Sequence, residues 1–216
     1  MERIDKFYQS INGSIFYFVG VAISIISIIT SIIMYTAGGA TYSILNNFVS
    51  DLGATIAPNY AFIAFNTGLI LNSIISPFGT LFLALVFLNN DIKQKTIVWF
   101  WFFINIISAI ATFLVAIFPE DIMIVPHVIA AIITFFFGMM SYVIYGIIII
   151  LIEKLAKYHS ILGFLLALVS FIFIFSWVFR FNVSIITLLE WIVLFGGWAF
   201  GIYLGVLSLK LKVSKS

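Results

Sequence analysis

Residues 128–152 read VIAAIITFFFGMMSYVIYGIIIILI, an apolar run without a single charged side chain. A helix needs roughly 20 apolar residues to cross a bilayer core about 30 Å thick. Five further runs fill most of the remaining chain, at residues 14–36, 59–88, 97–118, 161–179 and 185–209. A transmembrane β-barrel would instead show short segments of alternating hydrophobicity. The sequence therefore predicts an all-α polytopic membrane protein, a six-transmembrane-helix bundle that forms a single domain over residues 1–216.

The amino-acid composition supports a membrane protein and excludes several kinds of site. Hydrophobic residues make up 64% of the chain and charged residues 8%, whereas a soluble domain carries roughly a quarter charged residues. The chain has no cysteine, which excludes disulfides, thiolate nucleophiles and cysteine-ligated metals. The first apolar run is longer than the core of a typical signal peptide, so we expect a retained span.

The basic residues orient the predicted bundle. Six spans place nine of the ten Lys and Arg residues on one side: Arg3, Lys6, Lys93, Lys95, Lys154, Lys157, Lys210, Lys212 and Lys215. Only Arg180 falls on the other side. Because cytoplasmic loops carry an excess of Lys and Arg, we expect both termini in the cytoplasm and the protein in the cell membrane. The net charge of +2 comes from these loops, so nucleic acid is not an expected partner.

Small and polar residues recur at helical spacing in several spans. Asn105, Ser108 and Thr112 follow one another in the third span, and Gly197 and Gly201 in the sixth. Such stripes let helices approach closely in lipid. We interpret them as helix-packing surfaces.

Apart from the charges on the cytoplasmic side, the ionisable residues gather at the outer ends of the helices. They are Asp51, Glu120, Asp121, His127, Arg180 and Glu190. A carboxylate inside a span costs a few kcal/mol unless it is paired or faces a cavity. Glu190 lies inside the sixth span on the face of Gly197 and Gly201, and His127 begins the fourth span on the face of Gly138. We therefore expect Glu190 and His127 to point into the bundle.

The outer cluster suggests two kinds of chemistry. Ser50, Asp51, His127 and Glu190 combine a hydroxyl, a base and carboxylates, the groups used for acyl or ester transfer or hydrolysis on a lipid. The same residues have a structural interpretation, in which Ser50 and Asp51 cap a helix and His127 pairs with Glu190. Whether the protein is an enzyme stays open.

A metal site is a weaker alternative for the same cluster. Asp51, Glu120, Asp121, His127 and Glu190 offer one nitrogen and several oxygens for a divalent cation. No His-x-x-x-His spacing supports it, and the second histidine, His159, lies in a loop on the opposite side, which disfavours haem. We expect neither a metal nor a cofactor.

Binding requires less of the cluster than catalysis does. Inward polar residues beneath an apolar bundle are suited to hold a lipid headgroup, and the candidates are Asp51, Asn66, His127, Arg180 and Glu190. Membrane lipids are thus the expected partners. An accessory subunit of a larger membrane complex, with other membrane proteins as partners, remains a further alternative.

Several short motifs resemble those of a known six-span superfamily. They are FVSDLG at 48–53, PH at 126–127, TF at 134–135 followed by Gly138, and EW at 190–191. That superfamily includes the damage-regulated autophagy modulators, the Frag/Sfk-type proteins and the GPI-anchor lipid-remodelling factors. Asn59, Asn66 and FPED at 118–121 are similar to its prokaryotic branch, the domain-of-unknown-function family 998. The resemblance implies a six-span fold, and the eukaryotic relatives imply a role connected with lipids.

Overall fold

The computed structural model describes residues 7–8, 11–89, 92–153 and 155–210. Its long helices are α2 (Ser14–Ala37), α3 (Ala61–Leu88), α4 (Lys95–Ile117), α5 (Ile124–Leu151), α6 (His159–Val178) and α7 (Val183–Lys210). Two short 3-10 turns, η1 (Ser50–Gly53) and η2 (Pro58–Tyr60), precede α3. All six long helices are long and apolar enough to cross a membrane. This confirms the predicted all-α fold with six membrane-spanning helices.

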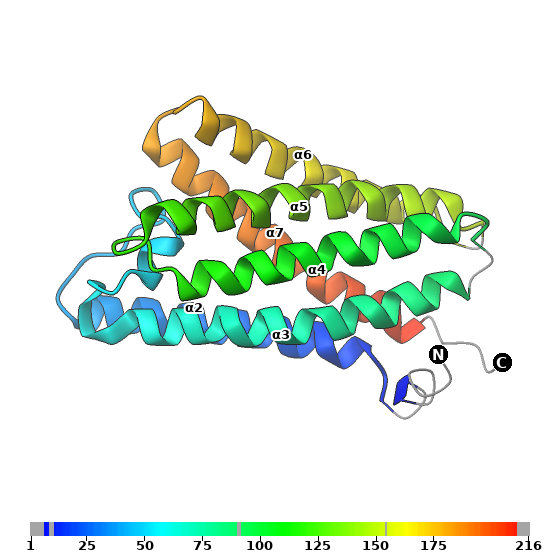
Figure 1. The fold of residues 1–216 in the computed structure, drawn as a ribbon, viewed down its shortest axis with the longest axis horizontal. Coiled ribbons are helices and arrows are strands. Elements are labelled where there is room, and N and C mark those ends of the chain that lie inside the picture. The colour runs from blue at the N-terminus through cyan, green and yellow to red at the C-terminus, as the bar shows by residue number, and fades with distance from the viewer. Residues whose placement is uncertain (1–6, 9–10, 90–91, 154, 211–216) are drawn as a thin grey trace.

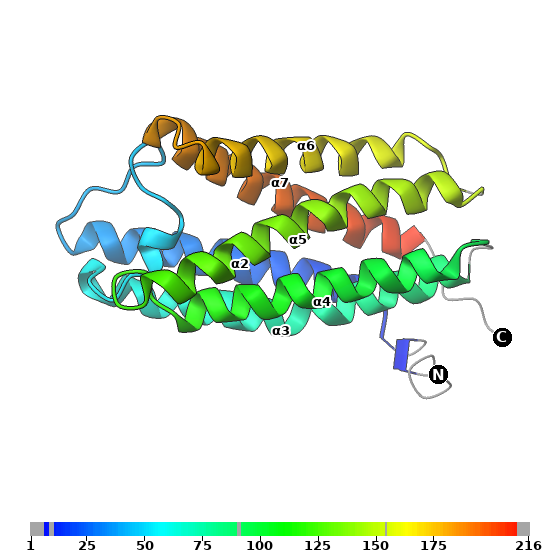
Figure 2. The same cartoon turned by 45° about the horizontal axis from the view of Figure 1, so that its top comes forward.

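The six helices run up and down and form a closed ring (Figures 1 and 2). Each packs against its neighbours in sequence, and α2 packs against α7. One end of the ring, here called the lysine end, holds Lys93, Lys95, Lys157 and Lys210. The other, the carboxylate end, holds the α2–α3, α4–α5 and α6–α7 connections (Figure 1). Arg3, Lys6, Lys154, Lys212 and Lys215, which entered the charge argument, lie outside the described residues.

Five of the six long helices begin two to four residues away from the expected position, and two of these shifts have a clear local cause. The helix α5 starts at Ile124 rather than at 128, because Pro126 needs no hydrogen-bond acceptor for its nitrogen in the first turn of a helix. The helix α3 starts at Ala61 rather than at 59, because Asn59 and Tyr60 adopt left-handed backbone angles, with φ of 54° and 58°. His127 consequently sits within the first helical turn of α5.

The lysine half of the ring is a packed apolar core. Its fully buried members come from α3, α4 and α5, and include Leu83, Val86, Phe87, Val98, Trp101, Tyr145, Ile148 and Ile149. Apolar side chains on the outer faces, such as Ile26, Phe103 and Ile161, are more than half exposed. Because these faces would lie against lipid, their exposure agrees with a membrane-embedded ring.

Glycines close the ring where α2 meets its two neighbours. A Cβ on Gly68 would overlap the side chain of Ser27, so α2 and α3 approach closely there. On the other side of α2, a Cβ on Gly201 of α7 would lie 2.7 Å from Val21. A hydrogen bond of 2.8 Å from Trp198 Nε1 to Ser24 Oγ joins the same two helices. Small residues therefore act here as the helix-packing surfaces expected in lipid.

Candidate functional site

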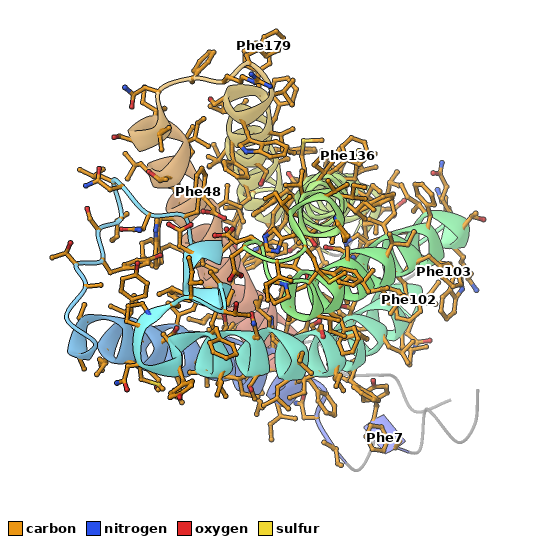
Figure 3. All side chains as sticks on the ribbon, turned by 60° about the vertical axis from the view of Figure 1, so that its left-hand side comes forward. Phe7, Phe48, Phe102, Phe103, Phe136 and Phe179 are labelled. Atoms are coloured by element: carbon orange, nitrogen blue, oxygen red, sulfur yellow. The ribbon has the colours of Figure 1, made fainter. Side chains whose placement is uncertain are left out.

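The long α2–α3 connection folds back into the ring at the carboxylate end. We call residues 41–57 the plug. Leu52 is completely buried and Val49 nearly so, and both pack against Ile28, Phe65 and Trp191. Figure 3 looks toward this end, and Phe48 marks where the plug enters between the helix ends. Apolar burial thus draws a loop into the bundle, where its polar backbone groups need partners.

Helix side chains satisfy the backbone of the plug. The backbone N–H of Val49 donates to Glu190 Oε2 at 2.8 Å, two turns inside α7. The side-chain amide of Asn66 in α3 donates to the carbonyl of Gly53 at 3.1 Å. Glu190 is 7% exposed. The buried carboxyl of Glu190 therefore ties the plug to α7.

Asp51 belongs to the plug, where it interacts with backbone and side chains of the plug itself and with Glu120 of the α4–α5 loop. Its Oδ2 accepts hydrogen bonds from the backbone N–H of Phe48 at 3.1 Å and the Asn47 amide at 3.0 Å. This is a cap on the η1 turn, as in the structural interpretation of the sequence. Its carboxyl also lies near Glu120, as does the hydroxyl of Ser50, and both influence the pKa of Glu120. A carboxyl pair with a hydroxyl beside it results.

Glu120 comes from the α4–α5 loop and also faces His127. The distance from its Oε2 to His127 Nε2 is 3.8 Å. The other ring nitrogen, Nδ1, lies 2.7 Å from the carbonyl of Phe118. Because a carbonyl only accepts, Nδ1 carries the proton, and the Nε2 lone pair of a neutral ring is directed at Glu120. The structure thus pairs His127 with Glu120 rather than with Glu190.

The pKa of Glu120 rises from its ordinary value near 4.5 to about 7. Burial is the main cause, and the hydrogen bond with Asp51 adds to it, while the bond with Ser50 acts in the opposite direction. Two carboxyls in contact avoid repulsion by holding one proton between them. At neutral pH the Glu120 carboxyl is therefore about half protonated, and its proton can be exchanged.

Two of the expected site residues lie elsewhere. Asp121 turns toward the plug, where it accepts hydrogen bonds from the backbone N–H groups of Thr55 at 2.9 Å and Ile56 at 3.2 Å. Desolvation raises its pKa, but the bonds from Thr55 and Ile56 outweigh that and leave the pKa below its usual value. Arg180 is exposed in the α6–α7 turn with a φ of 53°. Asp121 fastens two loops together, and Arg180 contributes no side chain to the cavity.

The metal alternative receives no geometric support within the part of the chain that the structure describes. There, no group of three or more His, Asp or Glu side chains is arranged to hold a metal ion. Asp121 points away to Thr55, and one oxygen each of Asp51 and Glu190 is taken by backbone N–H groups.

A cavity of about 400 Å³ extends from this cluster into the middle of the ring. Ser50, His127 and Glu190 line it at the carboxylate end, and Tyr17, Thr80 and Trp101 line it toward the lysine end. Its volume falls within the range of small-molecule sites. Of the ionisable cluster, His127 and Glu190 therefore face an internal space, whereas Asp51 and Glu120 do not line it.

Polar side chains continue through the middle of the cavity. Ser141 donates to Asn105 Oδ1 at 3.0 Å, and the Asn105 amide donates to the carbonyl of Trp101 at 2.8 Å. Ser108 donates to the carbonyl of Thr134 at 3.2 Å. The stripe in α4 that we interpreted as a packing surface thus faces a cavity. The sequence shows these amide and hydroxyl groups at helical spacing. That spacing is the same for a helix-packing surface and for a cavity wall, so the sequence does not tell the two apart.

Two glycines leave room in the cavity wall. A Cβ built on Gly138 of α5 would meet nothing closer than 4.0 Å, and one on Gly197 of α7 would meet the Tyr142 hydroxyl at 3.5 Å. Both glycines line the cavity. They differ from Gly68 and Gly201, where a neighbouring helix fills the space, and they keep the cavity wide at its centre.

Comparison with known proteins places the chain in a family. No curated protein and no solved structure matches it. The family model described as "Protein of unknown function (DUF998)" matches residues 18–207. The match runs from α2 to α7 and includes the plug, His127 and Glu190. The chain belongs to the DUF998 family.

Proposed function

We propose that this protein binds the polar head of a membrane lipid or similar amphiphile at the carboxylate end of its cavity. The observation that carries the proposal is Glu190, a carboxyl inside a span that lines a polar cavity. An ionisable group in a membrane span marks a functional site by default. The apolar part of the ligand remains in the surrounding membrane, because polar side chains line the cavity through its middle.

The charges of the site define the head that it binds. Glu190 supplies a carboxyl and His127 an imidazole to the cavity wall, the carboxyls of Glu120 and Asp51 lie behind them, and no Lys or Arg among the described residues lines the cavity. Carboxylates form their strongest hydrogen bonds with cationic donors. A head that carries an amine or several hydroxyls therefore fits better than a bare phosphate, for which Arg180 lies in the wrong place.

The resemblance to a superfamily with lipid-remodelling members supports the same class of ligand. The positive-inside rule places the lysine end in the cytoplasm and the site in the outer leaflet of the cell membrane. This orientation makes the carboxylate end accessible to lipids of the outer leaflet.

Native mass spectrometry after mild extraction tests the binding function. We expect a bound lipid on the wild-type protein that is lost in Glu190→Gln. Glu153→Gln is the matched control, because Glu153 is an exposed carboxyl at the lysine end, 3.5 Å from Lys93. A wild-type protein without lipid, or equal occupancy in Glu190→Gln, would refute the proposal. A stoichiometric protein partner in place of lipid would support the accessory-subunit alternative.

A lipid-hydrolysing enzyme is the second candidate, and one observation favours it. Glu120, with a pKa of about 7, faces the free Nε2 of His127, which is an arrangement suited to acid–base catalysis at neutral pH. His127 would accept the proton of a water molecule whose oxygen attacks an ester carbonyl. Glu120 would then give its proton to the departing alcohol oxygen.

Ser50 enters this scheme in a different role from the one that its hydroxyl suggested. The Ser50 hydroxyl lies near Glu120 and lowers the pKa of that carboxyl, and no hydrogen bond joins Ser50 to His127 among the described residues. When incubated with extracted lipids, the wild-type protein and Glu153→Gln should release fatty acid from the lipids. His127→Ala should not. Equal release by all three proteins would exclude the site as the source.

A further inference from the structure

The cavity covers most of the thickness of a membrane. Along α5 it is lined from His127 to Tyr142, which at 1.5 Å per residue corresponds to a length of about 22 Å. A bilayer core is about 30 Å thick. Only the packed core of the lysine half separates the cavity from the opposite end of the ring.

Polar groups line the cavity at every level. Thr112, Ser108 and Asn105 follow one another along α4, and Ser76 and Thr80 continue along α3 toward the lysine end. A cavity of this size has room for water, and the polar groups on its walls supply the hydrogen-bond partners that water needs. Water and hydroxyl groups in sequence form the hydrogen-bonded chains along which protons move.

A chain of partly buried hydrogen bonds crosses the remaining core. The Tyr145 hydroxyl donates to the Tyr203 hydroxyl at 3.0 Å, and the Tyr203 hydroxyl lies 2.7 Å from His159 Nδ1. Tyr145 is completely buried, so its hydroxyl needs this partner. With Nδ1 unprotonated, each hydroxyl proton points to the next acceptor, and the chain ends at the first residue of α6.

The chain begins beside the cavity. Tyr17 lines the cavity with a buried hydroxyl that has no hydrogen-bond partner among the described residues, so the step from the cavity to the Tyr145 hydroxyl requires a water molecule. At the other end, His159 contacts the ring of Tyr158 at a centroid distance of 4.2 Å and lies within electrostatic reach of Lys210. Ligand binding at the carboxylate end requires none of these groups.

We infer that the bundle conducts protons along a track from Glu120, His127 and Glu190, through the cavity, to Tyr145, Tyr203 and His159. A proton binds to the cluster at the carboxylate end and moves through the cavity by exchange between hydrogen-bonded groups. It passes the two tyrosine hydroxyls, and His159 releases one proton at the lysine end. The reverse direction uses the same groups. One proton enters for each that leaves, so no other reactant is needed. Chains of Asp, Glu and His within membranes serve as proton relays elsewhere.

Proteoliposomes provide the test. The purified full chain is placed in phosphatidylcholine vesicles that contain a pH-sensitive dye, and a potassium gradient with valinomycin sets the membrane potential. We expect proton uptake above that of protein-free vesicles. The double variant Tyr145→Phe/Tyr203→Phe, which keeps both rings and removes both hydroxyls, should lower the rate at least tenfold.

A second variant blocks the cavity itself. Gly138→Leu places a side chain where a Cβ meets nothing within 4.0 Å, so it should fold and lower the rate at least tenfold. Tyr35→Phe is the control, because Tyr35 packs against Tyr42 at the carboxylate end and lies outside the track. Wild-type vesicles that match protein-free ones would overturn the inference, and so would an undiminished rate in either track variant.

Discussion

Glu120 controls the charge of the carboxylate end, because it contacts both the plug and His127. Its neighbours are the carboxyl of Asp51, the hydroxyl of Ser50 and the Nε2 of His127. The first favours a proton on Glu120, and the second favours its absence. The protonation of one loop residue thus decides whether the site presents one or two negative charges beside the imidazole.

The free energy of unfolding should therefore decrease as the pH rises from acidic to mildly basic values. The pKa of Glu120 is about 7 in the fold and near 4.5 without it, so the folded protein binds this proton more tightly. The stabilisation is complete below about pH 4.5 and is lost as the pH rises through about 7. Thermal unfolding in detergent at pH 5, 6, 7 and 8 measures it. Glu120→Gln should reduce the slope, and an unchanged slope would show that another group titrates.

Individual site residues could be predicted only in part. The cost of a charge in lipid predicts that Glu190 and His127 point inward, and the structure buries both, with 7% and 6% exposed. The partner of His127 could not be predicted, because it depends on how the α4–α5 loop folds back. Arg180 illustrates the same limit: sequence places it at the correct end but gives no direction for its side chain.

The plug combines local turns with tertiary contacts to the helices. Glu190, Asn66 and Asp121 reach it from α7, α3 and the α4–α5 loop. The six spans follow from hydropathy, because each run must be helical to satisfy its backbone in lipid. The plug has no comparable signal, since its turns are short and its place in the ring depends on partners far away in sequence.

Removal of the Glu190 carboxyl should loosen the plug. In Glu190→Ala the buried N–H of Val49 loses its acceptor, which costs about 1–3 kcal/mol and raises local opening about tenfold or more. Hydrogen exchange of residues 47–53 measures this opening. Leu188→Ala, a change at an exposed position of the same helix, should leave it unaltered. Equal exchange in both variants would mean that Glu190 does not hold the plug.

Two glycines should respond in opposite ways to a single methyl group. Gly68→Ala forces the added carbon into Ser27 at the α2–α3 contact, and overpacking of this kind costs about 1–3 kcal/mol. Gly138→Ala adds the same carbon to open space and should be neutral or stabilising, because alanine favours a helix. Unfolding temperatures in detergent compare the two, and a larger loss at Gly138 would contradict the assigned cavity wall.

At the scale of the whole molecule, most of the described charges of opposite sign lie at opposite ends of the ring, and Glu153 and Arg180 are the exceptions. Four carboxyls, at Asp51, Glu120, Asp121 and Glu190, lie at one end, and Lys93, Lys95, Lys157 and Lys210 lie at the other. The sequence predicts this separation from the number of spans. The cavity could not be predicted, because its width depends on how six helices pack together.

Single cysteines can test the proposed orientation without background, because the chain has none of its own. In intact cells, a membrane-impermeant maleimide should label Ile122→Cys, at a position that is 67% exposed. It should label Lys157→Cys at the lysine end only after the membrane is permeabilised. The reverse result would place the lysine end outside.

The contact between α2 and α7 also bears on how the chain is made. Synthesis proceeds from the first helix to the last, but α2 packs against α7, which carries Glu190. The helix α7, which contributes part of the cavity wall and the acceptor for the Val49 N–H, is thus synthesised last. Until α7 has left the ribosome and inserted, the plug has no carboxyl to bind, so a truncated product would expose an unfinished interior that membrane quality control can recognise.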